Sequence, residues 1–265
     1  MTRYWLTPLI ALALMAAGAT AAAASAASPA LTAHQTAAQH TVVPGHPMGW
    51  IPGGSPDSTN STAQSTNWSG YAVTGGTDAF HSVSASWVEP KVTCNGTKYA
   101  AFWVGLDGYN SDSVEQTGSD SDCTGSSPTY YGWFEMYPAD PVYYTNTVKA
   151  GDHFHAYVAF SGTDSYTLFL EDITRGWTHK VTKTSSGDDR SSAEVITEAP
   201  SSGTGVLPLA DFGTVDYTAA KANGTLMSSQ SPVQITMIDS SNNDKDSTST
   251  ITSASAFDNT WIRAN

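Results

Sequence analysis

Basic residues are scarce in this sequence, and their scarcity limits the partners it can bind. Only 11 of the 265 residues are Lys or Arg, against 24 Asp or Glu, so the formal net charge is −13. Proteins that bind nucleic acid need a basic surface to neutralise phosphates, which argues against a nucleic-acid partner. An acidic surface also suits acidic solution, because protonation of carboxylates lowers its self-repulsion.

Long apolar runs are equally scarce beyond the N-terminus. No later segment approaches the ~20 apolar residues of a membrane-spanning helix, so we expect a soluble mature protein with no membrane partner. Residues 1–27 have a short basic start, an apolar run and a small-residue end with Ala-x-Ala sites, which is typical of a signal peptide. The alternative, a membrane anchor, is disfavoured because the strongly apolar part is short for a bilayer. We therefore predict a secreted, extracellular protein.

Residues 28–60 lack the apolar side chains of a folded core and are rich in Ala, Thr, His, Gln, Pro and Ser. Such a segment cannot bury enough apolar surface to offset the entropy of ordering. It is predicted to be a flexible linker or a pro-segment, and the sequence leaves both open. Residues 61–265 are long enough for one domain with a sizeable core, for which a monomer is the default expectation.

Cysteine is nearly absent, with Cys94 and Cys123 as the only two. In an exported protein an even pair predicts a disulfide. This bond would close a loop that contains Gln116 and contribute roughly 3 kcal/mol in the chain-entropy model. The alternative, a thiol nucleophile, is disfavoured by an oxidising compartment and by the lack of a nearby His in sequence.

Helical periodicity is also missing beyond the N-terminal segment. Period-two segments separated by Gly, Asp, Ser and Asn turns instead predict an all-β protein of two packed antiparallel sheets, with closure into a barrel left open. The nearly continuous apolar run at 99–104 is typical of a central strand buried on both faces. The expected strands are 67–73, 80–88, 99–104, 130–137, 153–160, 166–170, 179–184, 193–197, 212–217 and 233–238.

Common hydrolase signatures do not occur. The sequence has no Gly-x-Ser-x-Gly, no His-Glu-x-x-His and no Asp-Thr/Ser-Gly loop. His153 and His155 lie two apart on an expected strand and share a face, but no third ligand is evident. We therefore expect no metal and no cofactor.

Carboxylates carry the remaining candidate chemistry. Glu135 shares a strand face with Trp133 and Tyr137, so it lies either in a substrate groove or buried as a structural carboxylate. Glu194 and Glu198 lie four residues apart and also share one face. For a lone Glu, a solvated strand edge is the commoner environment.

Four motifs together resemble the glutamic peptidases, the eqolisin family. They are Trp103-Val-Gly-Leu-Asp-Gly108, Gln116-Thr-Gly118, Trp133-Phe-Glu-Met-Tyr-Pro138 and Ala193-Glu-Val-Ile-Thr-Glu198. Each motif is weak alone, but their order and spacing are specific, and Asn67-Trp-Ser-Gly70 and Phe212-Gly213 add to the match. The resemblance covers most of the chain from about Asn67 to Thr218.

The resemblance implies a concanavalin-like β-sandwich whose concave sheet carries the cleft, and an acid endopeptidase insensitive to pepstatin. Its catalytic pair falls on Gln116 and Glu198, and its substrate is a protein or peptide. The residues that it places in the groove or behind the pair are Trp103, Asp107, Trp133, Glu135 and Tyr137.

Three positions depart from the family pattern. Val195 and Met136 stand where an aromatic residue is usual, and alternation predicts that both point away from the catalytic face. Glu115 stands where an aliphatic residue is usual, and it would raise the pKa of Glu198 if the two lay close.

Two other functions suit the same fold. A non-catalytic module would bind carbohydrate or peptide on an aromatic platform that includes Trp133 and Tyr137, but it has no need of Gln116 with Glu198. A glycosidase would use Glu135 and Glu198, with carboxyl groups about 5 Å or about 6.5–9.5 Å apart according to stereochemical class.

Overall fold

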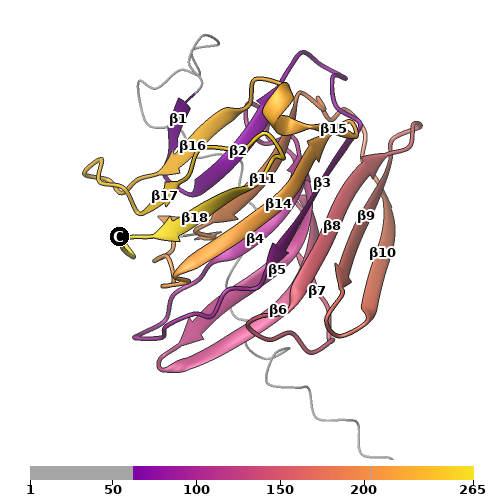
Figure 1. Ribbon diagram of the computed structural model, residues 1–265. Helices are drawn as coiled ribbons and strands as arrows, with labels where there is room; N and C mark the ends of the chain where they lie inside the picture. The colour runs from indigo at the N-terminus through magenta and orange to yellow at the C-terminus, as the bar shows by residue number, and fades with distance from the viewer. Residues whose placement is uncertain (1–61, 204) are drawn as a thin grey trace, which may run out of the picture. The chain divides into compact units, whose positions relative to one another are not determined.

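The computed structural model describes residues 62–203 and 205–265, and the predicted signal peptide and linker lie outside them. These residues form eighteen strands and one 3₁₀ turn, Met227–Ser229, with no α-helix among them (Figure 1). Within the same residues no helix is long and apolar enough to cross a membrane.

The strands form two large sheets. The first sheet runs in the order β1 (Thr62–Ser65), β16 (Val233–Met237), β2 (Trp68–Thr74), β11 (Ser192–Glu198), β4 (Ala101–Leu106), β5 (Val114–Thr124), β6 (Ser127–Tyr137) and β7 (Val142–Tyr143). The second runs in the order β10 (Trp177–Thr184), β9 (Ser165–Asp172), β8 (His153–Phe160), β3 (Ser82–Val88), β14 (Thr214–Ala222), β18 (Phe257–Trp261) and β17 (Asp246–Thr248), with β15 (Thr225–Leu226) beside β14. A separate hairpin joins β12 (Ser201–Ser202) to β13 (Gly205–Val206). All pairings between these named strands are antiparallel except that of β1 with β16.

The main core lies between the sheets, and strand alternation explains how it forms. In β3 the residues Val83, Ala85 and Trp87 are buried while the serines between them are partly exposed. In β4 all six residues are buried, because both faces of this central strand are covered. The two-sheet prediction is confirmed, and the barrel alternative is wrong, since each sheet ends in its own edge strands.

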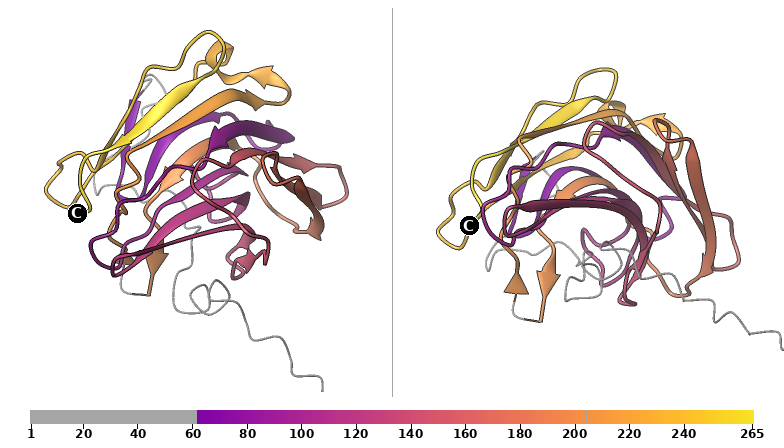
Figure 2. Two further views of the ribbon diagram at one scale, coloured as in Figure 1. Left: turned by 60° about the horizontal axis from the view of Figure 1, so that its bottom comes forward. Right: turned by 90° about the horizontal axis from the view of Figure 1, so that it is seen from below.

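A second apolar cluster covers the other face of the first sheet. The two sheets curve as nested arcs, with the first sheet as the inner one (Figure 2). On its inner face lie Trp68, Trp103, Trp133 and Ile196, each with no exposed surface. We call this the cleft face.

Strand β5 lacks the alternation of apolar and polar residues that is typical of a strand, because it carries polar residues on both faces. The side of β5 toward the core carries Ser119 and Ser121, whose hydroxyls both donate to the buried Glu89 carboxylate. The Trp87 indole N–H in turn donates to Ser119 Oγ at 2.9 Å. This internal hydrogen-bond network replaces the apolar contacts from which a strand is normally predicted.

The predicted disulfide is confirmed. Cys94 and Cys123 are bonded, with Cα atoms 5.3 Å apart and a sequence separation of 29 residues. Cys123 lies near the end of β5, so the covalent loop includes β4 and the stretch of β5 that carries Gln116.

Candidate active site

Glu198 lies at the end of β11, between β2 and β4. On this strand Ile196 packs in the cleft-face cluster, whereas Ala193 and Val195 pack in the main core. Glu198 therefore faces the cleft with Ile196, as alternation predicts, and it is fully buried.

Two N–H groups hold the Glu198 carboxylate. Trp103 Nε1 donates to Oε2 at 2.9 Å, and Asn67 Nδ2 donates to Oε1 at 3.3 Å. The Asn67 amide is itself fixed by Ser65 Oγ, which donates to its Oδ1 at 3.0 Å. Because donors to both oxygens favour the charged form of a carboxylate, this environment suits an ionised Glu198. Asn67 was noted only as part of a motif, and its contact with Glu198 was not predicted.

Gln116 faces the cleft from β5 and is also fully buried. Its Nε2 donates to Glu135 Oε2 at 2.7 Å, which fixes the plane of the amide. Its Oε1 has no hydrogen-bond partner within residues 62–203 and 205–265. One amide hydrogen and the amide oxygen are therefore left for a further partner.

The Trp103 side chain separates Gln116 from Glu198. Gln116 pairs with Gly105 of β4, and Glu198 pairs with Ala101, so the two lie on either side of the strand that carries Trp103. Added Cβ atoms would meet Trp103 at 2.7 Å from Gly105 and 2.6 Å from Gly118. Glycine at 105 therefore makes room for the indole ring, and glycine at 118 permits the close approach of the β4 backbone.

Two aspartates that the sequence did not single out support the groove aromatics. Trp133 Nε1 donates to Asp120 Oδ1 at 2.7 Å, and the Tyr131 hydroxyl donates to Asp122. Burial raises the pKa of Asp122 to about 7, and burial together with Asp122 raises the pKa of Asp120 well above its usual value. Tyr137 remains partly exposed at the end of the same strand.

Asp107 lies at the end of β4 and braces the segment that leads into β11. Its carboxylate accepts the backbone N–H of Arg190 at 2.6 Å and of Ser191 at 2.9 Å. Burial raises its pKa, and these hydrogen bonds lower it in part. Its role is thus to support the strand that carries Glu198.

Of the three departures from the family pattern, none faces the cleft. Val195 and Met136 pack in or against the main core, as predicted. Glu115 points from β5 toward the second sheet, where its charge helps to raise the pKa of the Tyr166 hydroxyl on β9. Burial and the nearby Asp188 raise the pKa of Glu115 to about 9.

Glu194 shares the cleft face with Glu198 but has a different environment. It pairs with Gly105, the same residue that pairs with Gln116 on the other side. Within the described residues neither Glu194 oxygen has a hydrogen bond of normal geometry. Burial raises its pKa well above the usual value, and the Ser192 hydroxyl lowers it only in part. The environment of Glu194 therefore favours its neutral form, whereas Glu198 is held by two donors.

No group of three His, Cys, Asp or Glu in the described ranges is arranged to hold a metal ion. His155, one of the two strand histidines, has its Nδ1 3.1 Å from Ser86 Oγ.

Comparison with known proteins identifies the family. The sequence profile of the peptidase A4 family matches residues 66–262. The chain belongs to this family. Aspergillopepsin-2 of Aspergillus niger, a curated relative, is 27% identical over 191 residues, which are 62% of this chain and 66% of that protein. The chain thus covers just under two thirds of this relative's length.

Solved structures of peptidase A4 relatives share the sandwich. Scytalido-glutamic peptidase with a transition-state analogue inhibitor matches with a TM-score of 0.64 and 25% identity, over 74% of this chain and 98% of that one. Aspergilloglutamic peptidase from Aspergillus niger matches with a TM-score of 0.52 and 25% identity, over 62% and 99%. The predicted family and its β-sandwich fold are therefore confirmed.

Proposed function

We propose that this peptidase A4 chain is a secreted, monomeric, pepstatin-insensitive acid endopeptidase that uses Gln116 and Glu198. The observation that carries the proposal is the pair of environments on the cleft face. Glu198 receives two N–H donors, and the Gln116 amide is oriented by Glu135 with its oxygen and one hydrogen left over. The relatives are named as glutamic peptidases, and one is bound to a transition-state analogue.

Glu198 acts as the general base. The ionised carboxylate takes a proton from a water molecule as the water oxygen attacks the carbonyl carbon of the scissile peptide bond. No covalent bond to the protein forms. The Trp103 and Asn67 N–H groups hold the carboxylate in orientation while it is charged.

Gln116 stabilises the oxygen on which negative charge develops. Its remaining Nε2 hydrogen donates to that oxygen, a role worth roughly 3 kcal/mol where one such donor has been removed from another hydrolase. An amide stays neutral and keeps its donor in acid, so it suits this role at low pH. The protonated Glu198 then gives its proton to the leaving amine as the C–N bond breaks.

Restriction to acid follows from the buried carboxyl groups around the pair. Asp120, Asp122 and Glu194 all have raised pKa values because they are buried on the cleft face. In acid they are neutral, whereas at higher pH their ionisation adds negative charge to the groove that holds Glu198. This added negative charge repels the oxyanion that forms during the reaction, and it destabilises the groove in which the carboxylates are buried.

The structure gives less support to the two alternatives. A binding platform needs several exposed rings, but Trp133 has no exposed surface and Tyr137 is only partly exposed. A glycosidase needs Glu135 and Glu198 close together, but β4 and β5 separate their strands, which puts the backbones about 14 Å apart at ordinary strand spacing. Glu135 is also engaged with the Gln116 amide.

The test is hydrolysis of an unfolded protein substrate from pH 2 to 8, with pepstatin present to suppress contaminating aspartic peptidases. We compare the wild type with Glu198→Gln, with Gln116→Ala, and with Glu171→Gln as a control at a partly exposed site on the outer face of β9. We expect cleavage only in acid, loss in Glu198→Gln, a fall of about 100-fold in Gln116→Ala, and no change in the control. Acid cleavage that persists in Glu198→Gln would refute the assignment.

A further inference from the structure

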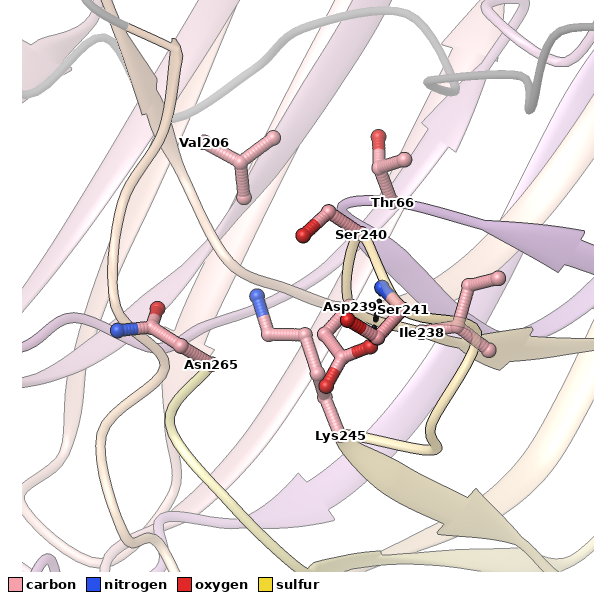
Figure 3. Close-up of a pocket in the computed structure, with 8 residues that line it drawn as sticks. All are labelled: Thr66, Val206, Ile238, Asp239, Ser240, Ser241, Lys245 and Asn265. Carbon is pink, nitrogen blue, oxygen red and sulfur yellow. Dashed lines mark hydrogen bonds between the residues drawn. The ribbon is translucent and has the colours of Figure 1, made fainter.

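A pocket of about 570 Å³ lies beside the end of β16, outside the row of residues described above (Figure 3). Its walls come from the segment before β2, the β13 strand, the loop between β16 and β17, and the last residue of the chain. The lining residues are Thr66, Val206, Ile238, Asp239, Ser240, Ser241, Lys245 and Asn265.

Lys245 is the one cation among these lining residues, and backbone hydrogen bonds fix its position. Its backbone N–H donates to Met237 O at 2.8 Å, and its carbonyl accepts the N–H groups of Ile262 at 2.9 Å and Arg263 at 3.0 Å. The residue is only 3% exposed, and its side chain extends into the pocket (Figure 3). Burial lowers its pKa to about 8, so the amine remains protonated in acid and at neutral pH.

The Lys245 ammonium has no ion pair or hydrogen bond within the described residues, although two carboxylates lie near it. The Asp239 oxygens are occupied by the backbone N–H groups of Ser241 at 2.7 Å and Asn243 at 2.9 Å and by the Asn243 side chain. Asp246 accepts instead from Ser69. The ammonium thus faces the pocket without a direct partner, and a charge-assisted hydrogen bond to an anion that enters the pocket is open to it.

The pocket borders the end of the cleft where Glu198 lies. Thr66, on its wall, directly precedes Asn67, which donates to Glu198. On the other side the chain continues from Glu198 into the β12–β13 hairpin, whose Val206 also lines the pocket. The Ala199 N–H donates to Asn67 O at 2.8 Å, which ties the two walls together beside the proposed base.

We propose that this pocket is a substrate subsite in which Lys245 binds a carboxylate of the peptide, and that it gives the enzyme a preference for acidic substrates. The inference rests on the proposed function, since it adds a specificity residue to the same cleft. The Ser240 and Ser241 hydroxyls and the Asn265 amide supply further donors in the pocket wall. The carboxylate comes either from an acidic side chain or from the C-terminus of a short peptide.

The experiment uses matched peptides and the full protein at pH 5. One set places Glu or Gln in turn at each position around a single cleaved bond, and a second set ends in a free carboxylate or in an amide. For wild type we expect kcat/KM to be about tenfold higher for Glu than for Gln at one position, or for the acid over the amide. The first result assigns the pocket to a side chain, and the second to a chain terminus.

Three variants connect the preference to Lys245. Lys245→Met keeps an unbranched side chain without the ammonium group and should remove the preference, Lys245→Arg should keep it, and Lys245→Glu should reverse it. Lys180→Met, at an exposed lysine on β10, is the control and should leave the preference unchanged. A preference that survives in Lys245→Met, or no preference in wild type, would overturn the proposal.

A measurement on wild type alone keeps the test decisive if a variant does not fold. The preference for Glu over Gln should disappear as the pH is lowered below about 4, where the substrate carboxyl becomes neutral while the lysine stays charged. A preference that persists at pH 3 would contradict carboxylate binding. Wild-type cleavage of the Gln peptides tests the proposed function separately, and if no peptide is cleaved, both proposals fail.

Discussion

Replacing Glu115 with Gln should make the protein more stable at neutral pH and leave its stability in acid unchanged. Glu115 is 1% exposed and points between the sheets, and burial together with Asp188 and Asp107 raises its pKa to about 9. In the unfolded chain its pKa is about 4.5. Because the folded pKa is the higher one, folding becomes less favourable as the pH rises from about 4.5 to about 9.

The size of the effect follows from the same two values. At pH 7 the pH lies about 2.5 units above the pKa of Glu115 in the unfolded chain, whereas Glu115 is still protonated in the folded chain. Each of these units lowers the free energy of unfolding by 1.36 kcal/mol. The Glu115→Gln variant should therefore be about 3 kcal/mol more stable than the wild type at pH 7, and equal to it within about 0.5 kcal/mol at pH 4. Gln keeps the shape of the side chain, so little of the difference comes from packing.

Urea unfolding followed by tryptophan fluorescence at pH 4, 5.5, 7 and 8 measures this difference. Both chains should also carry Glu198→Gln, so that folded molecules do not digest unfolded ones during the titration. Glu171→Gln on the outer face of β9 is the matched control and should show no pH-dependent difference. A Glu115→Gln effect that is the same at all four pH values would refute the argument, because a charge-burial penalty must grow with pH.

Three further predictions concern the site and the disulfide. Trp103→Phe removes the N–H that donates to the Glu198 carboxylate at 2.9 Å, and should lower kcat about 10- to 100-fold with a smaller effect on KM, as steady-state kinetics will show. The Glu135 carboxylate accepts from the Gln116 amide and fixes its orientation. In Glu135→Gln an amide that can either accept or donate takes the place of this carboxylate, so the Gln116 amide is less well oriented and kcat should fall at all acidic pH values. A kcat equal to that of the wild type at every acidic pH would show that Glu135 has no part in orienting the amide. Cys94→Ser combined with Cys123→Ser opens the covalent loop and should lower the free energy of unfolding by roughly 3 kcal/mol, with the folded spectrum retained.

The parts of the fold that sequence predicts well are those in which one strand face is apolar. Strand β8 was predicted with its observed bounds, His153–Phe160, because buried residues alternate with exposed or partly exposed ones from His153 to Ala159. Strand β5 was missed although Gln116 on it was predicted, since its hydroxyls and carboxylates pair with partners distant in sequence, such as Glu89. Alternation does not detect a strand that buries polar groups on both faces.

The candidate site shows the same division. The cleft-facing orientation of Glu198 follows from the pleat of its own strand, so local sequence was sufficient. The contact from Asn67, 131 residues away, depends on β2 and β11 being neighbours in the sheet. Lys245 was not singled out because its significance comes from the pocket around it, which is formed by segments far apart in the chain.

The position of β11 in the first sheet has a consequence for the order in which the molecule assembles. Strands β2 and β4 flank β11 and have no direct pairing, so a ribosome-bound chain that has not yet reached residue 198 has a gap in the sheet. Glu198 fills the last position of the strand that closes this gap. Pairings between strands so distant in sequence form slowly, on a scale of milliseconds to seconds. The fold thus brings the proposed base to its place in the cleft only after most of the polypeptide has been synthesised.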